Sequence, residues 1–429
     1  MSARRWAAGL GGATVLALTA GCGMLGIGGG EEKQSDEQRL VEMLNESRRL
    51  ESELMAAEYR IVQNCLEEQG HTVHEPWAME VYEEPETDSL TYGYAHEEFL
   101  LPPEEAKEWG FGQWANSMEG SEDPLSEEYY KAQEEKWAEE DGGTDYEEPD
   151  TSAWDALTPE EQYSWYVAYQ GEEYVKESYG TLEEFVGYAE EEAAYEEMTE
   201  EELAALDEEA AAEEAGEIDI EEDMGWEEPK PGGCQLEMIE ALYGEPRLVE
   251  TEWEMEEGET YIDKTWEYRP ENPLYSDPEE TMYENIEAEY SAAMADLQGE
   301  FIDCITARGY EGWEFTEYNS LPIWEFFGAL YYQNASAEEQ DMMYGGDSDV
   351  EVPEIPEAAG STYEEWKAYE IQTAVDFSEC GEEIGYAKAS EKAYDEANIK
   401  GYKTMEEDVY AWQEDMNNAI AKAQEVLDN

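Results

Sequence analysis

Two segments far apart in the chain carry the same helical pattern and end in the same short motif. Apolar side chains recur every three or four residues over residues 37–68 and again over 277–305, which is the spacing of an amphipathic helix. Cys65 stands five residues before Gly70 in the first segment, and Cys304 five before Gly309 in the second. Glycine is common just beyond a helix C-terminus. Because a repeat sets the domain count, we expect two related helical units.

The repeat also sets the expected domain boundaries. We expect a first helical unit over residues 37–246, with an acidic helical insert at about 119–228, and a second unit over 277–429. Residues 247–276 between them form a connector or one short β-hairpin, because apolar and polar side chains alternate there. The fold class is therefore mainly α, with two disulfide-stapled units.

The insert is predicted to be helical because it contains capping boxes. In such a box a Ser or Thr begins the helix and a Glu or Gln three residues later bonds back to it. The boxes begin at Thr158, Thr181 and Thr199. The insert is also rich in aromatic residues, which form either core stripes or a surface that binds a glycan or a protein partner. They include Trp154, Trp165, Tyr166 and Tyr169.

The N-terminus predicts export. Arg4 and Arg5 precede an apolar stretch over residues 6–20, which is too short to span a membrane, and small residues follow. Residues 1–21 are therefore predicted to be a signal peptide.

The residue after that peptide predicts a lipid anchor. Residues 18–22, Leu-Thr-Ala-Gly-Cys, resemble the lipobox of bacterial lipoproteins, in which the cysteine is diacylated and becomes the mature N-terminus. Thr19 stands where Leu, Val or Ile is usual, so an ordinary signal peptide cleaved elsewhere is the alternative. Acyl chains on Cys22 would hold the protein at the outer face of the cell membrane without a transmembrane helix. Glycine-rich residues 22–36 would form the tether.

Four cysteines remain besides Cys22, and an even number in an exported chain implies disulfides, here with three connectivities. No two of them form a C-x-x-C pair, which argues against a zinc ribbon or a thioredoxin-type site. Each copy of the repeat supplies one cysteine at the end of a long helix and another beside a later helix. We therefore expect Cys65 to pair with Cys234, and Cys304 with Cys380.

Acidic residues dominate the charge. The chain has 114 Asp and Glu against 22 Lys and Arg, a formal net charge of −92, which excludes nucleic acid and anionic headgroups as electrostatically attracted partners. The acids are spread along the chain rather than grouped at ligand spacing. They therefore favour adaptation to salty or alkaline surroundings, with non-specific cations, over a specific cation site. Aromatic residues make up 12% of the chain, which argues against wholesale disorder.

Signatures of catalysis and of cofactor binding are missing. The sequence contains no G-x-S-x-G, H-E-x-x-H, P-loop or G-x-G-x-x-G motif. Three histidines could bind zinc, and two acidic triplets have the 1-3-5 spacing of a calcium loop but lack its glycine and final glutamate. We interpret the histidines as solvent-facing or capping residues and the triplets as acidic loops, and expect neither metal nor cofactor. The histidines are His71, His74 and His96. The first triplet is Asp219, Glu221 and Asp223, and the second is Asp347, Asp349 and Glu351.

Short motifs over most of the chain resemble uncharacterised actinobacterial secreted lipoproteins with Cys-x4-Gly-aromatic helix ends. They lie at residues 65–71, 102–111, 157–171, 231–234, 304–310 and 374–380. The resemblance implies a lipid anchor, paired cysteines and a helical fold, but no activity.

We therefore expect a non-enzymatic envelope module that binds or spaces an unidentified protein or glycan. The alternative is a hydrolase of cell-wall polymer that uses acidic residues. A fold without a deep cleft lined by converging carboxylates would weigh against that alternative.

Overall fold

A computed structural model describes residues 34–140, 148–196, 198, 227–254, 260–275, 282–335 and 350–429. Residues Asp36–Asn429 form one compact unit. The predicted signal peptide, Cys22, the capping box at Thr199, both acidic triplets apart from Glu351, and the start of the second long helix lie outside the described residues.

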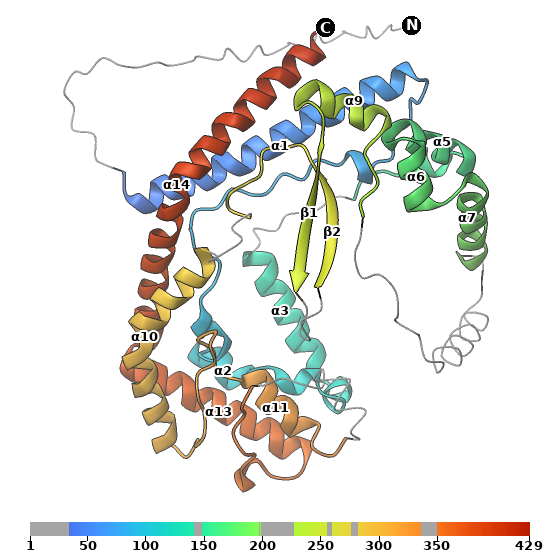
Figure 1. Cartoon of the computed structure of the whole chain (residues 1–429). Helices are drawn as coiled ribbons and strands as arrows, with labels where there is room; N and C mark the ends of the chain where they lie inside the picture. Colours follow the sequence, from blue (N-terminus) through green and yellow to red (C-terminus); the bar gives the residue numbers. More distant parts are fainter. Residues whose placement is uncertain are drawn as a thin grey trace, which may run out of the picture. The chain divides into compact units, whose positions relative to one another are not determined.

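The compact unit is mainly helical, as predicted (Figure 1). Its helices are α1 (Asp36–Glu68), α2 (Pro103–Trp109), α3 (Ser126–Glu140), α4 (Ser152–Asp155), α5 (Pro159–Gln170), α6 (Glu172–Tyr179), α7 (Leu182–Glu196), α9 (Gly233–Leu242), α10 (Met282–Ala307), α11 (Ile323–Tyr331), α13 (Tyr363–Ile384) and α14 (Tyr386–Leu427). Short 3-10 helices are η1 (Trp77–Met79), η2 (Ala95–Glu98), η3 (Gln113–Asn116), η4 (Gly120–Glu122) and η5 (Glu357–Ala359). Among the described helices, none is both long and apolar enough to cross a membrane.

One antiparallel hairpin lies within residues 247–276, as expected from the alternating side chains. Strand β1 (Arg247–Glu254) pairs with β2 (Thr260–Glu267), and Trp253 stands opposite Tyr261. Their rings are 6.5 Å apart and nearly parallel, so a cross-strand aromatic pair supports the register.

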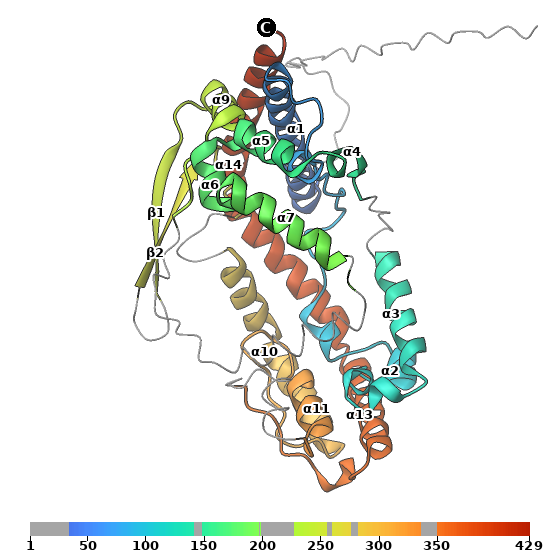
Figure 2. The same ribbon diagram turned by 90° about the vertical axis from the view of Figure 1, so that its right-hand side faces the viewer.

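The first and last described helices lie side by side, as Figures 1 and 2 both show. Leu40 and Met43 of α1 enter the same core as Tyr402 and Val409 of α14. The side-chain amide of Gln413 donates to the Met43 carbonyl (2.8 Å) inside this contact. Because α10 also packs on α14, the two segments of the repeat share one core.

The two copies of the repeat end in the same backbone geometry. The N–H of His71 donates to the Leu66 carbonyl (3.0 Å), and that of Tyr310 to the Ile305 carbonyl (3.1 Å). Gly70 and Gly309 have φ of 99° and 104°, a region that L-residues avoid. Both helices therefore end in a Schellman-type cap.

Both disulfides join the cysteines in the expected pairs. The Cα atoms are 5.7 Å apart in Cys65–Cys234 and 5.9 Å apart in Cys304–Cys380. Disulfides persist in oxidising compartments, so the protein is indicated to fold outside the cytoplasm.

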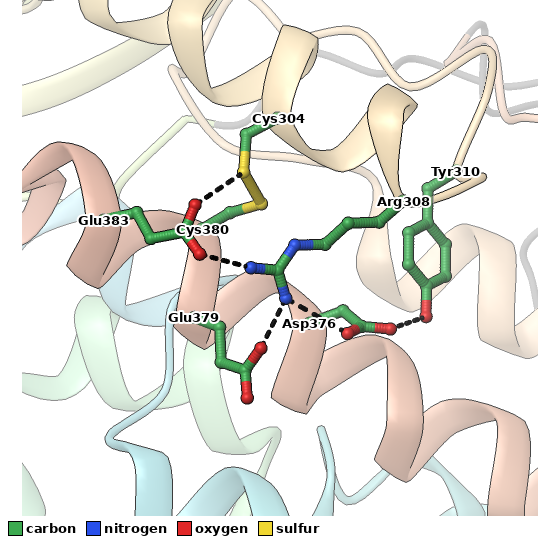
Figure 3. Close-up of a disulfide and its surroundings, with 7 residues drawn as sticks. All are labelled: Cys304, Arg308, Tyr310, Asp376, Glu379, Cys380 and Glu383. Carbon is green, nitrogen blue, oxygen red and sulfur yellow. Dashed lines mark hydrogen bonds and ion pairs between the residues drawn. A yellow bond between two sulfur atoms is a disulfide. The ribbon is translucent and has the colours of Figure 1, made fainter.

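A glutamate lies beside each disulfide, at the same position in both copies of the repeat. Glu237 lies three residues after Cys234, and Glu383 three after Cys380; their oxygens are 3.6 and 3.9 Å from the Sγ atoms of Cys65 and Cys304, respectively. In the second copy Arg308 donates to Glu383 (2.7 Å) and to Glu379 (2.5 Å) beside the disulfide (Figure 3). The likeness of the copies thus extends beyond the residues that the sequence comparison used.

The insert packs on the C-terminal half of α1 and on α9 in a second, smaller core around the first disulfide, which we call the insert core. Trp154 and Trp165 are buried there with Cys234, and Tyr166 and Tyr169 pack against them. These aromatic residues are therefore core stripes, not a free binding surface. Of the predicted capping boxes, those at Thr158 and Thr181 are formed, with reciprocal side-chain-to-backbone hydrogen bonds.

Candidate binding pocket at the junction of α13 and α14

A pocket of about 680 Å³ opens where α13 ends and α14 begins. Gly385, at φ 70°, separates the two helices. The segment of residues 96–103 and the end of α3 complete the walls. This volume is within the range of small-molecule sites.

The N-terminus of α14 forms one side of the pocket. The first hydrogen bond back along this helix runs from the Ala389 N–H to the Gly385 carbonyl (3.4 Å), so the N–H groups of residues 386–388 precede it. No side chain caps this end, and its first turn contains no acidic residue. In a chain with 114 acids, the positive end of a 42-residue helix is left without the carboxylate that usually stabilises it.

Lys388 lies in that first turn and lines the pocket. A cation near a helix N-terminus is destabilising, since it faces the positive end of the macrodipole. Lys392, Lys400 and Lys403 further along α14 are all ion-paired. Lys388 has no hydrogen bond or ion pair with any described residue.

Ser378 lies on α13, seven residues before Gly385, and is buried beside the pocket. Its side chain is 2% exposed, lines the pocket, and its Oγ has no hydrogen-bond partner among the described residues. A hydroxyl within a helix commonly donates to the carbonyl four residues earlier, as Thr373 does to Tyr369 on the same helix (2.8 Å). A buried hydroxyl left unsatisfied costs about 1–3 kcal/mol.

His96 lies at the pocket and is 4% exposed. Its Nδ1 is 2.8 Å from Ser390 Oγ, which is 2.7 Å from the Tyr290 hydroxyl. Burial lowers the pKa of His96, so its imidazole is neutral at neutral pH. Ser390 is fully buried between these two partners and does not line the pocket. The serine–histidine contact is therefore a core hydrogen bond rather than an activated nucleophile.

The rest of the lining contains both apolar and acidic side chains. Leu100, Leu101 and Trp137 line the pocket, and Trp137 is 64% exposed. Leu100 packs so closely on Gly381 that a Cβ there would lie 2.2 Å from a Leu100 methyl carbon. Three glutamates also line the pocket. They are Glu97, Glu382 and Glu391.

The histidines suggested by the sequence are not brought together. His74 accepts a hydrogen bond from Trp165 Nε1 (3.3 Å) in the insert core, whereas His96 contacts Ser390 in the main one. Over the described ranges, no three His, Cys, Asp or Glu side chains cluster as metal ligands would.

A second hollow lies on α1 beside Arg48. It measures about 300 Å³ and is lined by Glu51, Glu84 and Arg269 among others. Burial raises the pKa of Glu51, and the nearby Glu84 carboxylate adds to the effect. Glu84 itself is paired with Arg48 (2.8 Å). This hollow contains two carboxylates, as the hydrolase alternative requires.

The sequence reasoning missed Ser378 and Lys388. A local signal exists for Lys388, because Gly385 is followed by Tyr-Ala-Lys-Ala-Ser, a helix start with a base and no acid. Comparison of the chain with known protein families, curated protein sequences and solved structures gives no match.

Proposed function

We propose that this protein is a non-enzymatic, extracellular lipoprotein that binds a small molecule at the cell envelope. The observation that carries the proposal is the pocket at the α13–α14 junction. It is lined by Lys388 in the first turn of α14, which has no ion pair with a described residue, and by Leu100, Leu101 and Trp137. None of these groups has an adjacent base that would activate it as a nucleophile.

The proposed location rests on the disulfides and on the N-terminal sequence. The disulfides indicate an extracytoplasmic compartment. The lipobox-like sequence ending in Cys22, and the resemblance to secreted actinobacterial lipoproteins, support an acyl anchor in the bilayer. The net charge of −92 supports non-specific cations and no nucleic acid as further partners.

Native mass spectrometry of the protein purified from its own envelope tests the binding function. A small molecule should remain bound to the native protein and be lost from Ala387→Trp, which fills the pocket. Ala421→Trp, at an exposed position of the same helix, should retain it. Equal retention by both variants would contradict the proposal.

Mass spectrometry of the mature N-terminus tests the anchor. We expect a diacylglyceryl-cysteine at residue 22, and a protein that is released into the medium when Cys22 is replaced by Ala. A clean cut at another residue, with the native protein found free in the medium, would disprove the anchor.

The hydrolase alternative is favoured by one observation, the two carboxylates in the hollow beside Arg48. Burial raises the pKa of Glu51, whereas Glu84 is paired with Arg48, so the two carboxylates have different surroundings, as the two carboxylates of lysozyme do. Release of reducing ends from purified cell wall, abolished by Glu51→Gln but not by Glu53→Gln, would establish it. No release by the native protein would exclude it.

A further inference from the structure

We infer that the edge of strand β1 that faces away from β2 binds an extended cationic segment of another protein, as a third strand of the hairpin sheet. This edge belongs to β1 alone and does not line the pocket, so the inference goes beyond the small-molecule binding proposed above.

The two edges of the hairpin differ in what covers them. On the β2 side, the N–H of Glu228 donates to the Lys264 carbonyl (2.8 Å), and the N–H of Trp266 donates to the Glu228 carboxylate (2.7 Å). On the β1 side, no described residue outside the hairpin makes a backbone hydrogen bond to residues 248–252. Folded proteins usually cover a sheet edge, because its unpaired N–H and C=O groups pair readily with another chain. The β1 edge is therefore open to strand addition.

The register of the hairpin shows which groups of β1 face this edge. The backbone groups of Lys264 and Trp266 point away from β1, toward Glu228. Their register partners in β1 are Glu250 and Leu248, and these must direct their own N–H and C=O groups away from β2. Every second residue of a strand has the same orientation. Residues 248, 250 and 252 thus each offer a donor and an acceptor at the open edge.

The charge along this edge favours a cationic partner. The side chains of Glu250 and Glu252 are exposed and lie on the same face of the hairpin. Neither forms an ion pair with a described residue, and Lys264, which stands opposite Glu250, is paired with Glu227 instead (2.7 Å). Opposite charges on facing residues of neighbouring strands stabilise a sheet, and like charges destabilise it. A guest strand with Lys or Arg at alternate positions would pair with both glutamates, whereas a second copy of β1 would bring glutamates together.

The other face of the hairpin determines the residues between those cations. Val249, Thr251 and Trp253 project from β1 on this face, and the Trp253 side chain is 49% exposed. A neighbouring strand would contact an indole and two β-branched side chains there, and β-branched and aromatic residues pack well at such positions. The guest segment is therefore expected to alternate Lys or Arg with β-branched or aromatic residues.

Isothermal titration calorimetry of the purified native protein with three peptides tests strand addition. The first peptide is acetyl-Lys-Val-Lys-Val-Lys-Val-Lys-amide, and the others carry two backbone N-methyl groups, either on lysines or on valines. In an antiparallel addition, the residue opposite Glu250 exchanges both backbone hydrogen bonds with it. The lysine N–H groups then face β1 and the valine N–H groups face away. At equal charge, the peptide methylated on lysines should bind about tenfold more weakly than the one methylated on valines.

Charge variants of the protein separate recognition at the edge from attraction by the whole acidic chain. Glu250→Gln combined with Glu252→Gln should weaken binding of the unmethylated peptide about tenfold, because two cross-strand charge pairs are lost. Glu311→Gln combined with Glu314→Gln removes the same charge from exposed positions outside the hairpin. Because salt screens distant charges, this control should change the affinity less than about twofold in 0.15 M salt.

Three outcomes would overturn the inference. They are equal affinity of the two methylated peptides, unchanged affinity in Glu250→Gln combined with Glu252→Gln, and no binding of any peptide at millimolar concentration. Self-association of the protein that is abolished by Leu248→Pro would also overturn it, by assigning the edge to a second copy. Proline at this position removes an outward N–H and leaves the bonds between β1 and β2 in place. None of these outcomes bears on the pocket, whose function is tested separately.

Discussion

Glu370 is a carboxylate placed entirely inside the protein. It accepts hydrogen bonds from the N–H groups of Gln113 and Trp114 (2.9 and 3.0 Å) and from the Tyr331 hydroxyl (2.6 Å). Burial nevertheless raises the pKa of Glu370 to about 7, because desolvation disfavours the charged form more than these bonds favour it.

This raised pKa predicts a pH dependence of stability. Between about pH 4.5 and 7 the folded protein keeps a proton on Glu370 that the unfolded chain has lost, so this contribution is present below pH 4.5 and is lost as the pH rises through 7. Between pH 5 and 8 the free energy of unfolding of the native protein should therefore fall relative to that of Glu370→Gln. Chemical denaturation at a series of pH values measures this difference. Glu364→Gln, at an exposed position on the same helix, should show the same pH dependence of the free energy of unfolding as the native protein. A difference between the native protein and Glu370→Gln that does not change with pH would refute the prediction.

Glu58 is the buried carboxylate of the other core. Its side chain is fully buried and accepts hydrogen bonds from Arg269 and from the Tyr243 hydroxyl (2.5 Å). Replacement of Arg269 by Met leaves a buried charge without its partner, which should lower the free energy of unfolding by roughly 3 kcal/mol. Arg247→Met breaks only an exposed pair with Glu267 and should cost less than about 1 kcal/mol. Similar losses for the two variants in urea denaturation would contradict this assignment.

At the scale of elements, the ends of the two long helices should respond alike to mutation. A Cβ at Gly70 or Gly309 would meet no atom within 4 Å, so only the positive φ opposes it. Gly70→Ala and Gly309→Ala should each destabilise by about 1 kcal/mol. Gly299, inside α10, is equally uncrowded but has no positive φ. Gly299→Ala should therefore stabilise the protein, by up to about 1 kcal/mol. Thermal unfolding should show a lower melting temperature for Gly70→Ala and Gly309→Ala and a higher one for Gly299→Ala.

The elements were predictable from sequence where the signal is local. The apolar period predicts α1 and α10, the Thr-x-x-Glu boxes predict α5 and α7, and the repeat predicts the disulfide pairs. Glu58 was not singled out, although it interrupts the apolar stripe of α1 at a core position. One glutamate among 114 acidic residues gives no sign of burial unless its place on the helix face is considered.

The candidate site was not predictable in the same way. Ser378 and Lys388 are close in sequence, but the rest of the pocket comes from residues 96–103 and from Trp137. Only tertiary packing brings these segments together. The missing hydrogen bond of Ser378 is a property of the folded chain, and no sequence pattern reports it.

At the scale of the whole molecule, the net charge of −92 predicts stability that depends on salt. Repulsion among the acids is screened over about 10 Å at 0.1 M salt and about 3 Å at 1 M. The melting temperature should rise by several degrees over this range, to the same extent in sodium, potassium and choline chloride. A flat melting temperature would contradict the screening argument, and a rise in only one of the salts would indicate a specific cation site instead.

The contact between α1 and α14 has a consequence for the order in which the molecule can fold. Leu40 and Met43 find core partners in Tyr402 and Val409, more than 350 residues later in the chain. Many proteins fold from their N-terminus while the chain is still emerging, but here the first long helix has no complete packing surface until α14 is available. The N-terminal half of α1 would thus complete its packing only when nearly all of the chain is available, whereas its C-terminal half can pack earlier against Trp165 and Ile239.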